Sequence, residues 1–285
     1  MNCFIRPCRR SVFLEGALNK VALSILGLAA LVATPAFAAD MAVKAPVVAA
    51  PPALGWTGFY IGGNVGGVTN SNSGTSNFTD SLPNLAFPAG NRINATGFIG
   101  GVQAGYNWQF APRWLVGVEA DGDFTNTKYG FCRGTIVPGV CGDTGFGTDT
   151  LSSNTAWLST VRGRFGTIAM DKLLIYATGG AAWGRIDTTA TQSCLVGGCG
   201  VSPLATSGTS SSSVTRSGWV AGLGGEWNID GNWFARAEWL HVDLGNVTSS
   251  VSTPGFAGST QTFSWSRGER FDQFRIGLDY RFWRG

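Results

Sequence analysis

The chain has 285 residues, of which only 13% are charged while 42 are glycine. A soluble domain usually carries about 25% charged residues, so this composition argues against an ordinary water-facing exterior. Of the 20 basic and 17 acidic residues, four and one lie within residues 1–38. The remainder has 16 of each and offers no net positive charge for nucleic acid.

The N-terminal segment has the pattern of an export signal. Four basic residues precede the short apolar run 21–33, and the tripeptide Ala-Phe-Ala at 36–38 supplies the small residues of a cleavage site. The apolar run is shorter than the roughly 20 residues that a membrane-spanning helix needs. We therefore expect a signal peptide over residues 1–38 and an extended Ala/Pro-rich periplasmic leader over 39–55.

The rest of the chain alternates with a period of two, which is typical of β-strands with two different faces. In the last predicted strand, Phe274, Ile276 and Leu278 share one face, while Arg275 and Asp279 share the other. In a membrane barrel the apolar face points to lipid and the charged face to the interior. The predicted strands are 56–65, 97–110, 114–124, 156–169, 173–186, 218–229, 233–244 and 271–283.

The connections between these strands alternate strictly in length. An up-and-down barrel with such connections has all its tight turns at one end and all its long loops at the other, as outer-membrane barrels do. The sequence therefore predicts an all-β fold, an eight-stranded antiparallel up-and-down transmembrane barrel over residues 56–285 with four long surface loops. The tight turns are 111–113, 170–172 and 230–232, and the loops are 66–96, 125–155, 187–217 and 245–270.

The tryptophans support the same interpretation. Trp108 and Trp114 lie at strand ends beside a turn, Trp183 and Trp219 lie toward the loop ends, and Trp265 lies inside a predicted loop. Tryptophan is enriched at both interfaces of a membrane, where it forms two aromatic girdles.

The interior of the barrel is predicted to hold a network of charges. Eight strands leave a lumen just wide enough for side chains to fill, so these charges are expected to pair and to plug it; a narrow conducting path is the alternative. Leu240 and Val242 share the charged face of their strand, and a bulge past Trp239 would move them outside. The predicted network comprises Glu119, Asp121, Asp123, Arg162, Arg164, Glu226, Arg236, Glu238, Arg275, Asp279 and Arg281.

Four cysteines follow the signal segment: Cys132, Cys141, Cys194 and Cys199. An exported chain lies in an oxidising compartment, so disulfides are expected, and pairing within each close couple is favoured because it closes the shortest loops. Neither couple has the CxxC spacing of a zinc site, and His241 is the only histidine, so no metal site is predicted.

The stretch "GWTGFYIGGNVGG" (55–67), with "RAEWLHVDLG" (236–245) and "DQFRIGLDYRF" (272–282), resembles the small porin-like outer-membrane immunogenic proteins of alphaproteobacteria. The resemblance covers the whole exported chain. It implies an outer-membrane barrel with antigenic loops, an assumed porin role, and haemin binding in some relatives. It also implies that Gly277, Tyr280 and Phe282 form the C-terminal signal read by the barrel-assembly machinery; here Trp283, Arg284 and Gly285 extend past the usual final aromatic residue.

The function predicted from the sequence is that of a structural, surface-exposed protein integral to the outer membrane. A narrow porin for small solutes is one alternative, and binding of haemin or another small ligand by the loops, with His241 as a candidate ligand, is another. No serine-hydrolase motif accompanies His241 and Asp243, so neither an enzyme nor a cofactor is predicted. The expected partners are outer-membrane lipid and lipopolysaccharide, the barrel-assembly machinery, and extracellular molecules that meet the loops.

Overall fold

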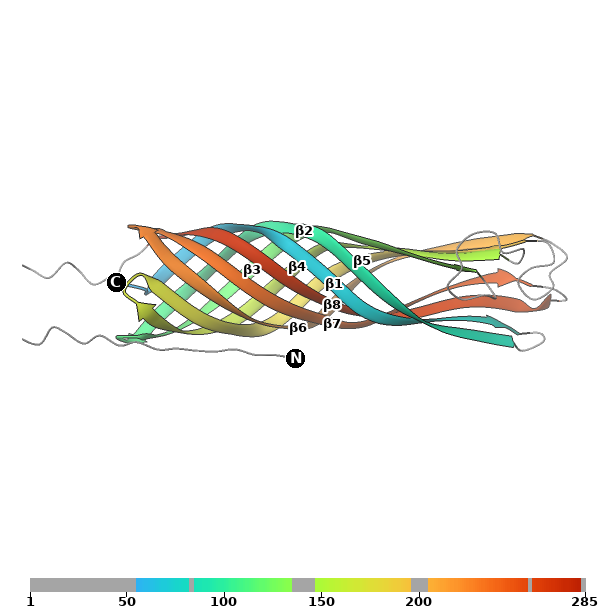
Figure 1. Ribbon diagram of the computed structural model, residues 1–285, viewed down its shortest axis with the longest axis horizontal. Coiled ribbons are helices and arrows are strands. Elements are labelled where there is room, and N and C mark those ends of the chain that lie inside the picture. Colours follow the sequence, from blue (N-terminus) through green and yellow to red (C-terminus); the bar gives the residue numbers. More distant parts are fainter. Residues whose placement is uncertain (1–54, 82–84, 135–146, 196–204, 256–257, 283–285) are drawn as a thin grey trace, which may run out of the picture. The chain divides into compact units, whose positions relative to one another are not determined.

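A computed structural model describes residues 55–81, 85–134, 147–195, 205–255 and 258–282, where the chain forms a closed antiparallel barrel (Figure 1). Each strand pairs with the next along the chain, and the last pairs with the first, so the predicted up-and-down barrel is confirmed. The signal peptide and leader predicted for residues 1–55 lie almost entirely outside the described residues. The strands are β1 (Gly58–Asp80), β2 (Leu85–Ala111), β3 (Trp114–Gly134), β4 (Gly147–Met170), β5 (Leu173–Cys194), β6 (Thr206–Asp230), β7 (Trp233–Pro254) and β8 (Thr260–Arg281).

The outward face of the barrel is apolar over a continuous band. In β8, Phe274 is 72% exposed and Ile276 65%, whereas Gln273 and Arg275 on the opposite face are buried inside. A soluble protein would bury such a set of aromatic and branched side chains. The face assignment made from the alternation of residues 271–283 therefore holds in the described part of that strand. Within the described ranges, no helix is long and apolar enough to span a membrane.

Aromatic side chains border this band at both ends. Trp108, Trp114, Trp227 and Trp233 are exposed near the short turns and form the turn-side girdle with Phe59, Phe110 and Phe282. The predicted loop position of Trp265 was wrong, since this residue lies in β8 with its side chain buried in the apolar cluster beyond the outer girdle. Trp56, directly before β1, is also buried and is not part of the turn-side girdle. Trp283 lies outside the described residues. The outer girdle, at the other end of the band, comprises Phe98, Phe124, Trp157, Trp183, Trp219, Trp239 and Phe274.

The strands continue far beyond the outer girdle, so the four long loops of the sequence prediction need correction. Most of each loop is strand: β1 and β2 stay in register from Gly58↔Asn107 to Asp80↔Leu85. A hairpin ladder, once started, carries Ser- and Thr-rich chain onward because its backbone hydrogen bonds do not depend on apolar side chains, and threonine itself favours strands. At this end the described strands stop at Asp80, Gly134, Cys194 and Pro254, and the next strands begin at Leu85, Gly147, Thr206 and Thr260.

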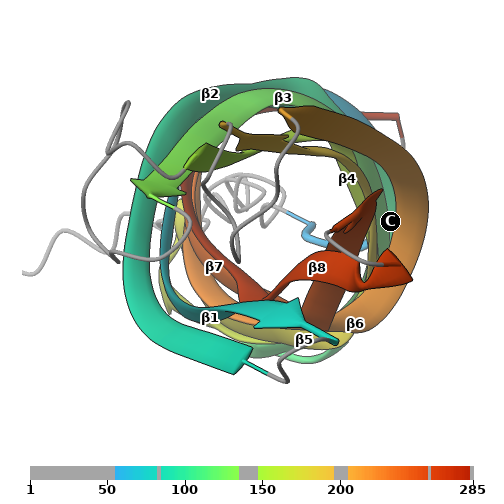
Figure 2. The same cartoon turned by 90° about the vertical axis from the view of Figure 1, so that its right-hand side faces the viewer.

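Beyond the outer girdle the ring of strands opens at two places. Pairing of β2 with β3 stops at Ile99↔Thr125, and pairing of β6 with β7 stops at Trp219↔Asp243, while the other ladders continue toward the strand tips. The barrel thereby becomes two four-stranded sheets, β7-β8-β1-β2 and β3-β4-β5-β6, which Figure 2 views along the barrel axis from that end.

The two sheets enclose a small apolar core. One sheet contributes Ala95, Val251, Phe263 and Trp265, and the other contributes Tyr129, Leu151 and Ala190. This is the packing of a β-sandwich, in which inward side chains of two sheets interdigitate. The part of the protein beyond the membrane band is therefore a side-chain-filled sandwich, built from the segments that the sequence assigned to loops.

Inward-facing glycines make room for large side chains in the narrow lumen. A Cβ atom added to Gly105 would lie 2.4 Å from the Tyr60 hydroxyl oxygen, and one added to Gly224 would lie 2.4 Å from the Tyr176 ring. By contrast, a Cβ atom added to the outward-facing Gly122 would meet nothing within 4 Å. The glycine content thus partly reflects the plugging of the lumen.

We predict that Gly105→Ala lowers the free energy of unfolding by about 1–3 kcal/mol, because the methyl group forces Tyr60 and the neighbouring backbone apart. Gly122→Ala is the matched control and should change it far less. Urea unfolding in detergent micelles, followed by tryptophan fluorescence, measures both. Equal effects of the two substitutions would contradict this account of the glycines.

Candidate functional site

The eleven charged residues predicted for the lumen all lie inside the barrel and join into one connected set, which we call the ion network. Three carboxylates come from β3, two arginines from β4, and the rest from β6, β7 and β8. Every member is at most 5% exposed. Buried charges are tolerated only when they are paired, and each member of this set is within ion-pair distance of at least one opposite charge.

The pairs cross the lumen from one wall to the other. Arg236 on β7 contacts Glu119 on β3, at the opposite side of the ring, with 2.6 Å between nitrogen and oxygen. Arg162 on β4 reaches Glu238 on β7 at 2.8 Å as well as Asp121 at 2.8 Å and Glu119. These ion pairs therefore lie across the interior of the barrel and join its opposite walls at this depth.

The same crossing occurs on the β8 side. Arg275 binds Asp123 at 2.5 Å and Glu238 at 2.6 Å, and lies 3.4 Å from Asp121. Arg236 also binds Glu226 at 3.0 Å and Asp279 at 2.8 Å. Because most carboxylates are shared between two or more arginines, the set behaves as one unit, and removal of an arginine leaves the whole network with one more uncompensated negative charge.

Uncharged side chains complete the network, and sequence reasoning missed most of them. The Tyr60 hydroxyl donates to Glu119 at 2.5 Å and accepts from Arg164 at 2.6 Å. Asn64 donates to Asp123 at 2.9 Å and Thr160 donates to Asp121 at 2.7 Å. Each has the inward parity of its strand, so the alternation that identified the charges could also have identified these polar partners.

The turn-side end of the lumen is closed by aromatic and aliphatic side chains. The Arg281 guanidinium lies 3.9 Å from the ring centre of Phe234 and 5.1 Å from that of Trp56. Leu115 and Leu174 pack in the same buried cluster. Trp56 therefore helps to close the turn-side end of the lumen. The attraction between the Arg281 cation and the aromatic faces of Trp56 and Phe234 stabilises this end.

A second, apolar layer fills the lumen between the ion network and the sandwich. Leu240 and Val242 are fully buried there, because β7 stays in register with β8 until a shift between Asp243 and Asn246. The alternative bulge just past Trp239, which would have turned them outward, does not occur. The apolar layer comprises Val68, Ile99, Leu158, Ala182, Ile186, Val220, Leu240, Val242, Leu244, Val247 and Phe271.

An additional buried pair lies in the sandwich, beyond the outer girdle. Arg267 and Glu269 are in contact, and the Arg267 guanidinium lies 3.3 Å from the Tyr129 ring centre. Burial raises the pKa of Glu269 and lowers the pKa of Arg267, in each case against the attraction of the partner. This pair is therefore held by its packing more than by favourable charge.

His241 lies on the outer wall and not in the lumen. Its Nδ1 atom is 2.9 Å from Asp272 Oδ1, and its ring lies 5.5 Å from that of Trp219. The histidine thus belongs to the outer girdle, at the level where polar headgroups begin. Within the described residues, no group of three or more His, Cys, Asp or Glu side chains is placed to hold a metal ion.

Two further sets of predicted residues occupy the ends of the strands. Gly277, Tyr280 and Phe282 lie on β8 or directly after it at the turn-side end, with the Tyr280 and Phe282 rings 5.3 Å apart; their role as an assembly signal stays a prediction. Cys132 and Cys194 are each disulfide-bonded. Cys141 and Cys199 lie outside the described residues, so the pairing stays a prediction.

A closed eight-stranded barrel with an apolar outer band, two aromatic girdles and a charged interior defines the class of outer-membrane β-barrels. The chain belongs to the family described as outer membrane protein beta-barrel domain, whose model matches residues 24–282. It is therefore an integral protein of the outer membrane.

Two curated relatives are named outer-membrane proteins. The chain is 33% identical to the 31 kDa outer-membrane immunogenic protein of Brucella melitensis over 90% of this chain and 98% of the relative. It is 28% identical to the 22 kDa outer membrane protein of Rhizobium leguminosarum over 85% of this chain and 83% of the relative. Neither name states an enzymatic activity. Among solved structures, the outer membrane protein OprG of Pseudomonas aeruginosa matches with a TM-score of 0.42 and 11% identity, covering 79% of this chain and 96% of that one.

We predict that Arg162→Ala lowers the free energy of unfolding by about 3–5 kcal/mol, because it removes a cation shared by Glu119, Asp121 and Glu238 and leaves one more buried negative charge uncompensated in the ion network. Arg185→Ala breaks an exposed ion pair with Asp187 on the outer wall and should change it by less than about 1 kcal/mol. Urea titration of both variants in the same micelles makes the comparison. A loss in Arg162→Ala no larger than that in Arg185→Ala would contradict the network.

Proposed function

We propose that the protein is a sealed, non-enzymatic barrel that anchors a surface-exposed β-sandwich in the outer membrane. The observation that carries this proposal is the direct contact between charged side chains of opposite walls, such as Arg236 with Glu119 and Arg162 with Glu238. A diffusion pore needs a continuous water path, whereas these contacts fill the cross-section at the middle of the membrane band.

The apolar layer supports the proposal independently. A passing ion would have to leave the polar network and cross a zone lined by Leu240, Val242 and Phe271, whose side chains offer it no hydrogen bond. Beyond it lies the packed core of the sandwich. The lumen thus has three successive filled zones of different chemistry, and only the first was expected from the sequence.

The alternatives receive less support. A narrow porin would need a water path through the polar lumen. The charged side chains of the ion network occupy that space as pairs with one another. Haemin ligation by His241 lacks a supporting partner set: the histidine lies on the outer wall with its ring 5.5 Å from that of Trp219, and within the described residues no group of three or more His, Cys, Asp or Glu side chains could hold a metal ion. The proposed role implies contacts with outer-membrane lipid and lipopolysaccharide, assembly by the barrel-assembly machinery, and extracellular partners at the sandwich or its connections, with no nucleic-acid partner.

Planar-bilayer conductance of the refolded chain 39–285 tests the proposal. The wild type should give no steady channels. A double variant of the ion network, Arg162→Ala/Arg164→Ala, should also stay closed, because the apolar layer lies in series with it. Adding Leu240→Ala and Phe271→Ala, which removes large side chains from that layer, should allow ion conduction.

Steady channels in the wild-type protein would overturn the proposal and would favour the alternative function, a narrow porin. Conduction by the Arg162→Ala/Arg164→Ala variant alone would show that the apolar layer does not seal the lumen. Each variant must first show the heat-dependent shift in electrophoretic mobility that distinguishes a folded barrel from an unfolded chain.

A further inference from the structure

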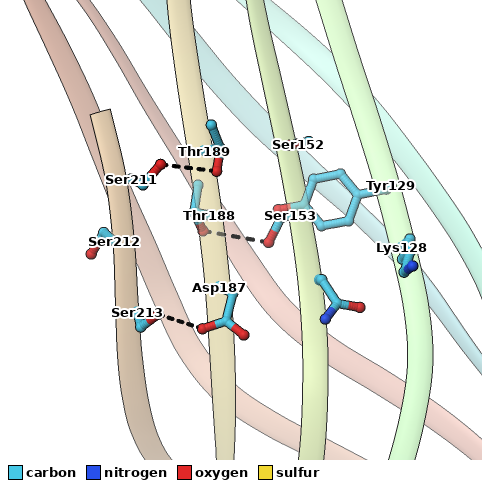
Figure 3. Close-up of a pocket in the computed structure, with 11 residues that line it drawn as sticks. Lys128, Tyr129, Ser152, Ser153, Asp187, Thr188, Thr189, Ser211, Ser212 and Ser213 are labelled. Carbon is cyan, nitrogen blue, oxygen red and sulfur yellow. Dashed lines mark hydrogen bonds between the residues drawn. The ribbon is translucent and has the colours of Figure 1, made fainter. Parts of the chain in front are cut away.

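The outer face of the β3-β4-β5-β6 sheet carries a hollow just beyond the outer girdle. Its volume is about 410 Å³, within the range of ligand sites. Figure 3 shows side chains from four neighbouring strands gathered around it. The polar groups at its surface are the hydroxyls of Ser152, Thr189, Ser211 and Ser213, the carboxylate of Asp187 and the ammonium group of Lys128.

The height of this hollow above the membrane band follows from the strands that form it. Asn154, which lines it, precedes the girdle residue Trp157 by three positions, and Ser211 precedes Trp219 by eight. At about 3.3 Å per residue and a tilt of about 45°, the hollow lies roughly 7–19 Å outside the girdle. The polar headgroup region extends about 5–8 Å beyond the hydrocarbon core on each side, so the hollow begins at its outer edge, above the lipid-facing surface of the same strands.

The polar groups are held in place by one another. Ser213 donates to Asp187 at 2.5 Å, and Arg185 donates to the same Asp187 oxygen at 3.1 Å. Thr189 and Ser211 share a hydrogen bond of 3.2 Å. A hydroxyl both donates and accepts, and a carboxylate accepts at two oxygens, so the bonded set still offers free lone pairs to a ligand.

The chemistry of the hollow fits a sugar better than a lipid chain or a simple anion. The hydroxyls, the Asp187 carboxylate and the Asn154 amide together offer both donors and acceptors, which suits the ring hydroxyls of a saccharide. The two cations nearby, Lys128 and Arg185, suit an acidic substituent on such a saccharide, while Asp187 opposes the binding of a bare phosphate. We propose that this hollow binds the core saccharide of an outer-leaflet glycolipid whose acyl chains lie against the barrel wall below.

The inference rests on the outer-leaflet contact included in the proposed function, but it does not depend on whether the lumen conducts. Conductance therefore tests the seal, and the binding experiment tests the hollow, so that the failure of one leaves the other intact.

The test measures binding of lipopolysaccharide that retains its core sugars, and of lipid A that lacks them, to the refolded chain 39–285 in detergent micelles by calorimetry. Ser211→Trp fills the hollow. Thr248→Trp is the matched control, because Thr248 is an exposed residue on the outer face of the other sheet, with a 3.2 Å hydrogen bond to Ser266 that mirrors the one between Ser211 and Thr189. Asp187→Ala removes the carboxylate with little steric change.

The wild type should bind the core-bearing glycolipid at least about tenfold more tightly than lipid A, which corresponds to about 1.4 kcal/mol. Ser211→Trp and Asp187→Ala should lose most of that difference, while Thr248→Trp keeps it. Equal affinity of the wild type for both lipids, undiminished binding by folded Ser211→Trp, or an equal loss in Thr248→Trp would overturn the proposal.

Discussion

The structure depends on one constraint: six carboxylates and five arginines lie inside a narrow barrel and must pair with one another across it. Ionised groups without partners in such a place would cost several kcal/mol each, so their positions are fixed by register. Glu119 faces Arg162 in the β3–β4 ladder, and Arg236 reaches Glu119 from the far wall. Inward-facing glycines such as Gly105 leave space for the tyrosines that complete the pairing, and the aromatic cluster around Trp56 covers the network from the turn side.

Residue alternation was sufficient to predict the barrel and the members of the network. Parity alone placed Arg275 and Asp279 inside and Phe274 and Ile276 outside, because a strand in a membrane barrel has only two faces. The same alternation places Tyr60 and Asn64 on the inner face of β1, although neither was among the predicted members of the network. Contacts between opposite walls could not be predicted from the sequence, since they depend on barrel closure and side-chain length.

The sequence was least informative beyond the membrane band. Ser- and Thr-rich segments look like loops when hydrophobic periodicity is the guide, yet they continue the ladders of β1 to β8. The end of pairing at Ile99↔Thr125 and at Trp219↔Asp243 has no evident sequence signature, although it converts a barrel into a sandwich. The hydroxyl-lined hollow lies on the outer face of one of the two resulting sheets, so this part of the exposed surface is formed by paired strands.

The central claim is that the lumen is closed between the ion network and the apolar layer. Thr160 lies at that junction: it is buried, donates to Asp121, and precedes Arg162 and follows Leu158 on the inner face of β4. The most direct measurement is the rate at which a small charged thiol reagent modifies Thr160→Cys in the folded barrel, with Ser213→Cys on the outer face as the reference. We expect rapid modification at position 213 and none at position 160 until the protein is unfolded. Comparable rates at the two positions would show that water and ions reach the middle of the lumen, and would contradict the account.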